Sequence, residues 1–457
     1  MSSLWLVQTA AERLAGAQAG LDTPLLARLI GVLGIAVMIG IAVLISYDRR
    51  RIDWRLVGAG LALQVLFGLV VLKTDVGRAF FNQVGRIVTG LLGFQEQGAR
   101  FVFGNLVQHS VPVGTPGANG TLDTAAGYVA ATGSYFAFNV LPTIIFFSAL
   151  MSVLYYLNVM QLVVKGIAWV MQKTLRTSGA ETLSASGNIF LGQTEAPLLI
   201  KPFVSAMTRS ELITVMVGGF ATVAGGVLAA YVGMLRGSFP DIAGHLLAAS
   251  VMNAPAGLYL SKILLPETET PVTRGSLRMD VQKPGANVIE AAASGAGQGM
   301  QLALNVGAML MAFVALVALA NYLLGWVGGF FGQDGLTLQL LLGQVLRPIA
   351  WFLGVPWAET AYVGGLVGIK VVLNEFVAYA QFASDLGSAV ALSPRSTVIV
   401  TYALLGFANF SSIAIQIGGI GGLAPERRSE IAALGLRAMI AGNLAAFTSA
   451  AIAGVLV

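Results

Sequence analysis

Two apolar, glycine-containing stretches of this chain carry amide and carboxylate side chains. The first reads GNIFLGQTEAPLLIKP, residues 187–202, and contains Asn188, Gln193, Thr194 and Glu195; the second contains Glu375. If these stretches lie in a membrane, each carboxylate costs at least ~2.5 kcal/mol at the bilayer centre, which makes it a functional candidate by default. The alternative is that each glutamate forms an ion pair, with Lys201 or Lys370, that only locks the local structure.

The composition indicates a membrane protein. Of the 457 residues, 56% are hydrophobic and only 10% are charged, whereas soluble domains average about 25% charged residues. A bilayer core of ~30 Å requires about 20 apolar residues per helix. Eight charge-free segments approach or exceed this length, and we expect eight transmembrane helices. These segments are Leu29–Tyr47, Leu56–Leu72, Thr124–Val164, Leu212–Leu235, Ile242–Ser261, Ala291–Gln333, Ser396–Pro425 and Ala438–Val457.

Basic residues gather in four loops, which sets the expected orientation. By the positive-inside rule these loops lie in the cytoplasm. Eight crossings then place both termini outside the cell, and two further segments enter the membrane and return without crossing it. The four clusters are Arg49, Arg50, Arg51 and Arg55; Lys173 and Arg176; Lys262, Arg274, Arg278 and Lys283; and Arg427, Arg428 and Arg437.

The two returning segments, residues 181–204 and 359–385, form an internal repeat. Both begin with Glu-Thr, both contain glycines, and both carry a polar residue followed by glutamate. Each precedes a span that opens with Arg-Ser and contains Gly-Phe-Ala: RSELITVMVGGFATVAGG in one case and RSTVIVTYALLGFANFSSI in the other. The two hairpins enter from opposite sides. Such inverted repeats build the substrate site of secondary transporters at the midplane from broken helices.

A hairpin that stops at mid-membrane leaves helix ends with unpaired backbone groups. These are tolerated only where they line a wet cavity or are buried in protein. In the first hairpin Gly187, Gly192 and Pro197 permit the break. Glu181 and Glu359 lie nearer the hairpin mouths, and we expect them to have structural roles.

The spans that follow the hairpins carry further polar residues. Thr222 and Asn409 occupy equivalent places in the repeat, and Ser411 and Ser412 follow Asn409. A buried asparagine needs hydrogen-bond partners, whereas a lone Thr or Ser in a membrane helix often bonds its own or a neighbouring helix. Phe407, one helical turn before Ser411, offers a flat wall for a ring.

These segments resemble those of the concentrative nucleoside transporter family in its bacterial eight-span form. The resemblance rests on GNIFLGQTEAPLLIKP, GFATVAGGVLAAY, LLPETET, GVPW, LNEFVAYAQF and GFANFSSIAIQIGGIG, which occur in family order from about Leu25 onward. It implies an all-α membrane protein with eight transmembrane helices, two re-entrant hairpins in an inverted repeat, and interfacial helices. It also implies a symporter in the bacterial inner membrane that takes nucleosides such as uridine into the cell.

The resemblance assigns a substrate site between the two hairpins and two discontinuous helices. It places one group of residues around the nucleobase and a second group on the ribose hydroxyls, with Phe407 close to the sugar. The nucleobase group is Gln193, Thr194, Glu195 and Val227, and the ribose group is Glu375, Asn409 and Ser412. An amide presents both a donor and an acceptor to a base edge, and a carboxylate makes charge-assisted hydrogen bonds to hydroxyls.

A sodium site beside the first hairpin tip is also implied. Its ligands are the side chains of Asn188 and Thr222 and the backbone carbonyls of Leu191 and Val223. All are neutral oxygens, which suits a monovalent cation at an unwound helix. Some bacterial members of the family use protons, so a proton-coupled nucleoside symporter remains the alternative.

The chain divides into four expected regions. Residues 1–180 hold the N-terminal spans and part of the scaffold, 181–264 the first transport repeat, 265–356 a cytoplasmic loop, a scaffold helix and an external connector, and 357–457 the second transport repeat. Segments 124–164 and 291–333 are long enough to be frame helices, where the resemblance places the contacts of a homotrimer. The charged, apolar segment from Asp75 is typical of an interfacial amphipathic helix.

The sequence bears on two other function classes. A passive channel also uses re-entrant hairpins, but it predicts flux without saturation or sodium dependence. An enzyme is not expected, because no nucleophile–base spacing or metal triad is visible. The sequence contains no basic stripe for nucleic acid and no Gly-x4-Gly-Lys-Ser/Thr loop for ATP, so an ion gradient is the expected energy source.

Overall fold

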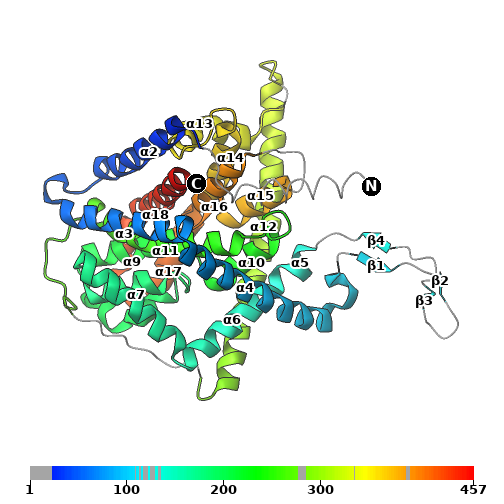
Figure 1. Ribbon diagram of the computed structural model, residues 1–457, viewed down its shortest axis with the longest axis horizontal. Helices are drawn as coiled ribbons and strands as arrows, with labels where there is room; N and C mark the ends of the chain where they lie inside the picture. Colours follow the sequence, from blue (N-terminus) through cyan, green and yellow to red (C-terminus); the bar gives the residue numbers. More distant parts are fainter. Residues whose placement is uncertain are drawn as a thin grey trace.

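The computed structural model describes residues 23–108, 110–112, 115–116, 122–123, 129–131, 135–275, 285–333, 335–386 and 392–457. The predicted external N-terminus and the basic residues Arg278 and Lys283 lie outside the described residues. Helices make up nearly all of the described chain, as Figure 1 shows. The all-α prediction is therefore confirmed for the bundle.

The N-terminal part contains two apolar helices followed by a long amphipathic one. Helix α2 (Leu25–Leu44) is followed by a 3-10 turn η2 (Arg49–Arg51), α3 (Trp54–Lys73), α4 (Asp75–Phe103) and a second turn η3 (Gly104–Val107). Asp53 and Thr74 accept hydrogen bonds from the first backbone amides of α3 and α4, which fixes where these helices begin. The helix predicted from Asp75 is thus present.

Two small antiparallel sheets follow α4 and were not predicted. Strand β1 (Ser110–Pro112) pairs with β4 (Val129–Ala131), and β2 (Thr115–Pro116) pairs with β3 (Leu122–Asp123). They project away from the helices (Figure 1). Segment 124–164, named above as long enough to be a frame helix, is not one continuous helix: its described part contains β4, the short α5 (Phe136–Asn139) and α6 (Leu141–Tyr156). After α6, Asn158 adopts a left-handed conformation (φ 61°) and a separate helix, α7 (Val159–Leu175), begins.

The first hairpin and its partner helices have the predicted broken form. The arms are α8 (Gly179–Gly187) and the 3-10 helix η5 (Ala196–Ala206). The span that follows is split into α9 (Arg209–Ala221) and α10 (Gly225–Leu235), and α11 (Ile242–Leu264) completes the repeat.

The second repeat has the same element order. The hairpin arms α14 (Thr360–Val372) and α15 (Glu375–Leu386) precede a split span and a final long helix. These are α16 (Pro394–Leu404), α17 (Phe410–Leu423), the turn η6 (Pro425–Arg427) and α18 (Arg428–Leu456). Between the repeats lie the 42-residue α12 (Val288–Gly329) and α13 (Leu338–Phe352).

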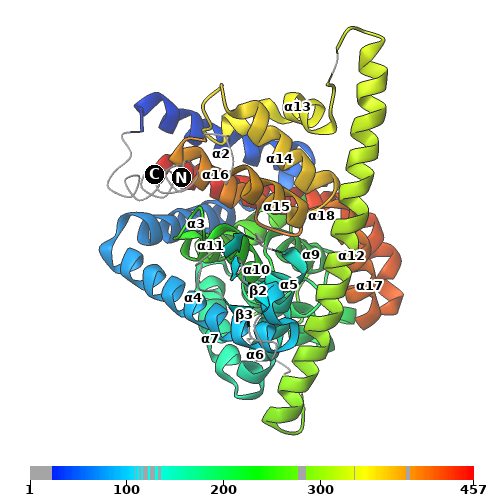
Figure 2. The same cartoon turned by 90° about the vertical axis from the view of Figure 1, so that its right-hand side faces the viewer.

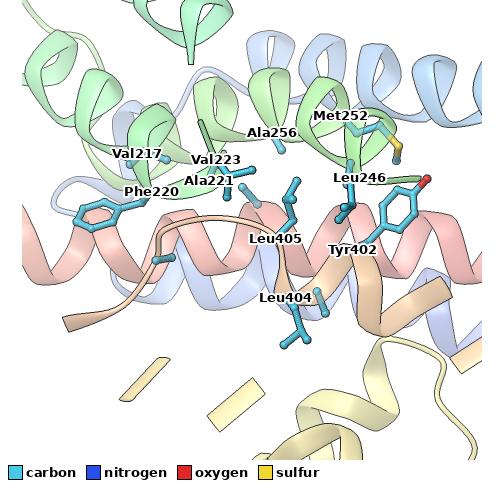
Figure 3. Packing of buried hydrophobic residues seen from close by; sticks show 14 of the residues in the cluster. Val217, Phe220, Ala221, Val223, Leu246, Met252, Ala256, Tyr402, Leu404 and Leu405 are labelled. Atoms are coloured by element: carbon cyan, nitrogen blue, oxygen red, sulfur yellow. The ribbon is translucent and has the colours of Figure 1, made fainter. Parts of the chain in front are cut away.

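The two helix breaks lie against each other, with Ala221 and Val223 of the first close to Leu405 of the second (Figure 3). Gly406 has φ +110°, and a Cβ there would lie 2.6 Å from the carbonyl oxygen of Phe220, so only glycine fits. The backbone N–H of Phe407 donates to the carbonyl of Thr222 at 3.3 Å. The two repeats are therefore joined through their unwound backbones.

Each repeat contains an equivalent hydrogen bond from an asparagine side chain to a backbone carbonyl. Asn253 on α11 donates its Nδ2 to the carbonyl of Ala221 at 2.7 Å, and Asn443 on α18 donates to the carbonyl of Ala408 at 2.8 Å. Ala221 and Ala408 are the alanines of the two Gly-Phe-Ala motifs. A carbonyl freed by helix breakage is thus satisfied in the same way twice, which supports the repeat alignment.

Helices α6 and α12 pack along each other beside the repeats. Gly295 and Gly299 of α12 admit this approach, because a Cβ at either would lie within 2.9 Å of α6 atoms. Figure 2 shows α12 along one side of the bundle, projecting beyond it at both ends. Gly225 and Gly226 of α10 also pack close to α6, and a Cβ at Gly226 would lie 3.4 Å from the Ile144 carbonyl oxygen.

All four basic clusters have described members at one end of the molecule. Arg51, Arg55, Arg176, Lys262 and Arg274 line one surface pocket. The loop residue Tyr47 connects this end to the last cluster, because the Arg437 guanidinium lies 3.8 Å from its ring centroid. The described basic residues of the four clusters therefore share one end, as the positive-inside rule requires.

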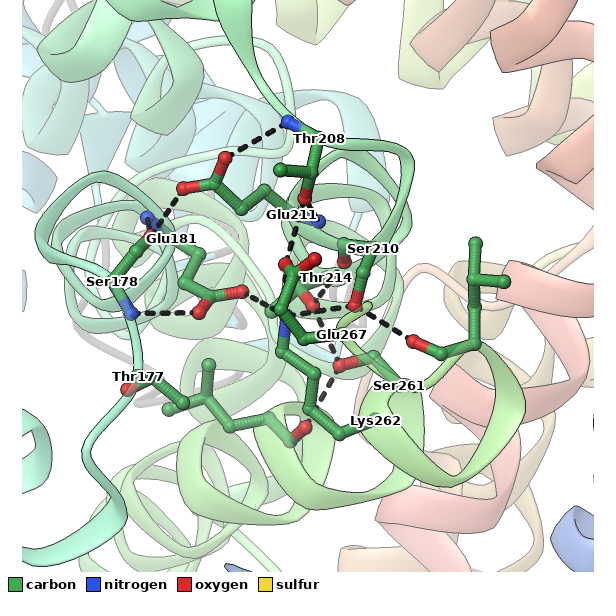
Figure 4. A network of polar contacts seen from close by, with 12 residues as sticks. Thr177, Ser178, Glu181, Thr208, Ser210, Glu211, Thr214, Ser261, Lys262 and Glu267 are labelled. Atoms are coloured by element: carbon green, nitrogen blue, oxygen red, sulfur yellow. Dashed lines mark hydrogen bonds and ion pairs between the residues drawn. The ribbon is translucent and has the colours of Figure 1, made fainter. Parts of the chain in front are cut away.

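Glu181 closes the mouth of the first hairpin at that end (Figure 4). It pairs with the buried Lys262 at 2.7 Å, and Lys262 also lies 3.5 Å from Glu267. At the second mouth, Glu359 accepts hydrogen bonds from the backbone and hydroxyl of Ser393 at 3.3 and 3.0 Å. These contacts support the structural roles expected for both mouth glutamates.

Six helices of the described chain are long and apolar enough to cross a membrane on length and composition alone. They correspond to α2, α3, α5–α6, α9–α10, α12 and α18 with η6. The two other predicted spans are α11, whose buried residues include Asn253 and Lys262, and the broken pair α16–α17. The eight predicted spans thus each have a helical counterpart.

Candidate substrate and cation site

Glu375 opens the second arm of the second hairpin. Asn374 caps this helix by accepting a hydrogen bond from Val377 N–H at 2.8 Å, and a helix N-terminus favours a carboxylate. Glu375 is only 4% exposed. Its Oε2 accepts from Asn409 Nδ2 at 2.8 Å and its Oε1 from the Tyr231 hydroxyl at 3.3 Å. The hairpin carboxylate is therefore held between α10 and the second helix break.

Asn409 ends the second break and starts α17. Its Oδ1 accepts from the backbone N–H of Ser412 at 2.9 Å and from the Ser411 hydroxyl at 2.7 Å. Because its amide NH₂ points to Glu375, one side chain both caps the helix and orients the carboxylate.

The first hairpin reaches the same helix from the other repeat. Gln193 donates its Nε2 to the Ser412 hydroxyl at 3.2 Å, and its Oε1 accepts from Gln416 Nε2 at 3.0 Å. Gln416 is fully buried and also donates to the Met216 carbonyl at 3.0 Å. A continuous set of polar contacts therefore runs from Gln193 through Ser412 and Asn409 to Glu375.

Thr194 and Glu195 complete the first hairpin tip. Thr194 packs against α17 where Gly419 leaves room, since a Cβ at Gly419 would lie 2.6 Å from Thr194 Cγ2. Glu195 is exposed, and its Oε2 accepts from the Gly192 N–H at 3.1 Å. Its carboxylate therefore keeps hydrogen-bonding capacity for another group.

The two apolar site residues predicted from the sequence flank the breaks. Val227 lies in the first turns of α10 and is 2% exposed. Phe407 lies within the second break and is half-buried. Tyr231, one turn after Val227, stacks on Tyr379 with ring centroids 4.3 Å apart, so aromatic side chains cover the Glu375 side of this region.

Asn188 is a fully buried amide whose Nδ2 and Oδ1 both lack a hydrogen-bond partner. It caps α8 and lies against α9, because a Cβ at Gly218 would be 3.3 Å from its Nδ2. Leaving such a group unsatisfied costs about 1–3 kcal/mol. A cation bound at Oδ1 would remove part of that cost, so this residue fits the cation site that the sequence predicted.

The other predicted cation ligands gather around the same break. Thr222 is 1% exposed, and its hydroxyl donates to the Gly218 carbonyl at 2.9 Å, which leaves its oxygen lone pairs available to a cation. Leu191 in the hairpin tip is 8% exposed, and Val223, which follows Thr222 in the break, is fully buried. The donor set consists of neutral oxygens, which suits a monovalent cation.

The ion-pair explanation for the two glutamates fails in the described part of the chain. Lys201 is exposed, and Lys370 donates to the backbone carbonyls of Ala403 and Leu405. The ion pairs found there include neither Glu195 nor Glu375.

Sequence reasoning missed Tyr231, Gln416 and the contacts of Lys370. Tyr231 follows Val227 by four residues and Gln416 follows Ser412 by four. Residues four apart share a helix face, and this spacing was the signal that could have identified both.

Comparisons with known proteins agree with this geometry. A family model described as the Na+ dependent nucleoside transporter C-terminus matches residues 245–454, and its N-terminal counterpart matches residues 33–106. A third model, for nucleoside recognition, matches residues 137–237. Together they span both repeats and the helices between them.

Whole-chain relatives are similar over nearly the full length. Nucleoside permease NupC of Helicobacter pylori is 42% identical, over 94% of this chain and 98% of its own. Sodium/nucleoside cotransporter 1 of Mus musculus is 41% identical, over 94% of this chain and 64% of its own. An uncharacterized transporter of Haemophilus influenzae is 47% identical, over 93% and 97%.

Solved structures show the same fold. CNTnw in an inward-facing, substrate-bound state has a TM-score of 0.83 and 44% identity, covering 94% of this chain and 98% of that chain. A doubly substituted CNTnw in an outward-facing state has a TM-score of 0.85 and 45% identity, over 95% and 98%. These relatives are transporters, so the chain is not an enzyme, and it belongs to the concentrative nucleoside transporter family.

Proposed function

We propose that this protein is a sodium-coupled symporter that carries nucleosides such as uridine into the cell. The observation that carries the proposal is the run of polar contacts from Gln193 to Glu375, which joins the two hairpin tips through α17. One end presents an amide and the other a carboxylate. This matches a ligand with a polar planar base at one end and hydroxyl groups at the other.

The base lies beside Gln193, Thr194 and Glu195 in this proposal, with Val227 against its face. The contacts with α17 use one of the two N–H donors and one of the two oxygen lone pairs of the Gln193 amide. A base edge can use the remaining donor and lone pair, or reach the amide through water. Glu195 supplies a further acceptor.

The ribose lies beside Glu375, Asn409 and Ser412, with Phe407 near the sugar. Each Glu375 oxygen already accepts one hydrogen bond and has a second lone pair. Hydroxyl donors on the 2′ and 3′ carbons can use these lone pairs, and hydrogen bonds to a charged acceptor are the stronger kind.

Sodium occupies the site of Asn188, Thr222, Leu191 and Val223. Support comes from the unpartnered Asn188 amide and from sodium-dependent relatives. Its Asn188 ligand begins the hairpin tip that carries Gln193, so cation binding orders the segment that contacts the substrate. When bound, the ion supplies a positive charge at the break of α9 and α10.

The membrane potential is enough to drive accumulation. One charge moving through 100 mV releases ~2.3 kcal/mol. At about 1.4 kcal/mol per tenfold change, this supports roughly 50-fold accumulation of nucleoside before any ion gradient is added.

The proposed setting is the inner membrane of a bacterium, with the basic end in the cytoplasm, both termini external, and three copies in contact through α6 and α12. The hairpins and broken helices move against that frame. Because Gly225 and Gly226 carry no side chain, α10 of the moving part can pack closely against α6 without interlocking side chains at these positions.

Substrate competition tests the proposal. Uridine and other pyrimidine nucleosides should compete for saturable uridine binding, with some tolerance for purines. Absence of uridine binding, with good binding of guanosine or inosine, would contradict the base assignment. The alternative of a proton-coupled symporter predicts uptake that follows a pH gradient without sodium, and a passive channel predicts flux that does not saturate.

A further inference from the structure

Lys370 is a buried lysine of the second hairpin to which the proposed substrate and sodium sites give no role. It lies near the end of α14 and is 0% exposed. Its Nζ donates to the carbonyl of Ala403 at 2.9 Å and to that of Leu405 at 3.1 Å, and it lies 5.6 Å from the ring centroid of Phe447. Each of these contacts is inside the bundle.

The two acceptors belong to the helix break. Helix α16 ends at Leu404, so Ala403 and Leu405 carry carbonyls that the broken helix leaves at its C-terminal end. That end of a helix carries partial negative charge and is stabilised by a cation. The ammonium group therefore occupies a position at the second break where a metal cation would otherwise be favourable.

In the alignment of the two repeats, Lys370 is equivalent to a position beside the proposed cation site of the first hairpin. Whether Glu181 is aligned with Glu359 or Glu195 with Glu375, Lys370 falls at positions 190–192, beside Leu191. The first repeat has Phe, Leu and Gly there. Two residues before Phe190 lies the neutral Asn188, whose amide has no partner.

We propose that Lys370 is the resident cation of the second repeat, a positioning residue that holds the α16–α17 break and, through it, Asn409 and Ser412. The first repeat has no cationic side chain at this place and, near its unpartnered Asn188 amide, requires an exchangeable cation. The second repeat carries its cation covalently and remains assembled without one. This inference rests on the proposed function, which assigns sodium to the site at Asn188, but the contacts of Lys370 do not depend on that assignment.

The charge balance is consistent with a protonated lysine. Both oxygens of Glu375 accept hydrogen bonds, as expected of an ionised carboxylate. A buried carboxylate is tolerated when a buried cation compensates it.

The first test removes the ammonium group. Lys370→Met, purified in detergent, should bind uridine at least tenfold more weakly than the parent, while sodium still raises its melting temperature through the Asn188 site. Lys201→Met, a change of the same chemistry on the exposed lysine of the other hairpin, should bind as the parent does. Lys370→Met with parental uridine affinity would overturn the proposal.

Chemical rescue separates charge from packing. In Lys370→Gly, added propylammonium should restore uridine binding, whereas 1-propanol, which fills the same space without a charge, should not. Equal rescue by both compounds, or by neither when the variant is folded, would contradict a cation role. Should neither variant fold, the ratio of sodium to uridine flux through the parent protein tests the proposal. A ratio of one sodium ion per uridine is expected. A ratio of two would show that a second exchangeable cation binds and would overturn the proposal.

These outcomes are distinguishable from failure of the proposed function. If uptake by the parent follows a proton gradient and ignores sodium, the sodium assignment fails. The effect of Lys370→Met on uridine binding then still tests the role of Lys370.

Discussion

Replacing Glu375 by Gln tests the ribose assignment most sharply. The amide keeps the shape of the carboxylate and both contacts in the protein: its oxygen can accept from Asn409 Nδ2, now 2.8 Å from Oε2, and its NH₂ can donate to the Tyr231 hydroxyl, now 3.3 Å from Oε1. The fold should therefore survive. What changes is the charge that a ribose hydroxyl would meet.

The expected loss follows from hydrogen-bond strengths. Bonds to a charged group contribute about 1.5–3 kcal/mol and neutral bonds about 0.5–1.5 kcal/mol, so each hydroxyl loses roughly 1 kcal/mol. At about 1.4 kcal/mol per tenfold change, the uridine Kd should rise roughly fivefold for one hydroxyl and about 25-fold for two.

Isothermal titration of parent and Glu375→Gln with uridine and 3′-deoxyuridine measures this directly. The substitution should cost less affinity for 3′-deoxyuridine than for uridine, because one of the affected hydroxyls is missing. Glu269→Gln, on the exposed loop, should behave as the parent. An unchanged uridine Kd, or an equal loss for both ligands, would refute the assignment of the 3′ hydroxyl to Glu375.

Three further predictions concern the cation site and the helix breaks. Asn188→Leu should abolish stabilisation by sodium, which at ten times Kd amounts to about 1.4 kcal/mol, as a thermal shift in sodium against potassium will show; a retained shift places the ion elsewhere. Gly406→Ala should lower the melting temperature and abolish uptake, because φ is +110° and the space is filled by backbone, whereas Gly418→Ala, where a Cβ meets nothing within 4 Å, should be neutral. Asn253→Leu and Asn443→Leu should each destabilise the fold by about 1–3 kcal/mol, since each leaves one carbonyl at a break unsatisfied; strongly unequal shifts in denaturation would argue against equivalent roles in the repeat.

The sequence predicted the elements whose signals are local. Charge-free length identified the spans, and the paired Glu-Thr, polar-acid and Arg-Ser motifs located both hairpins to within a few residues of α8–η5 and α14–α15. The turn at Asn158 and the strands between residues 110 and 131 were missed. A charge-free segment has the same composition whether it bends or not, so hydropathy alone could not divide 124–164.

The site was predicted in part, because its residues come from distant segments. Gln193 and Ser412 are 219 residues apart, yet 3.2 Å separates Gln193 Nε2 from Ser412 Oγ. Motifs named both, but no local pattern showed that they touch. The sequence suggested that Lys370 forms an ion pair with Glu375. In the structure, the Lys370 ammonium group donates hydrogen bonds to backbone carbonyls instead. Backbone acceptors at a helix break cannot be read from residue types.

Uridine uptake into proteoliposomes, with sodium and proton gradients imposed separately, tests the central claim most directly. An inward sodium gradient at equal pH should drive saturable accumulation of uridine above its equilibrium level, and a proton gradient without sodium should not. Uptake that follows the proton gradient alone, or that only equilibrates uridine without saturating, would contradict sodium-coupled nucleoside transport.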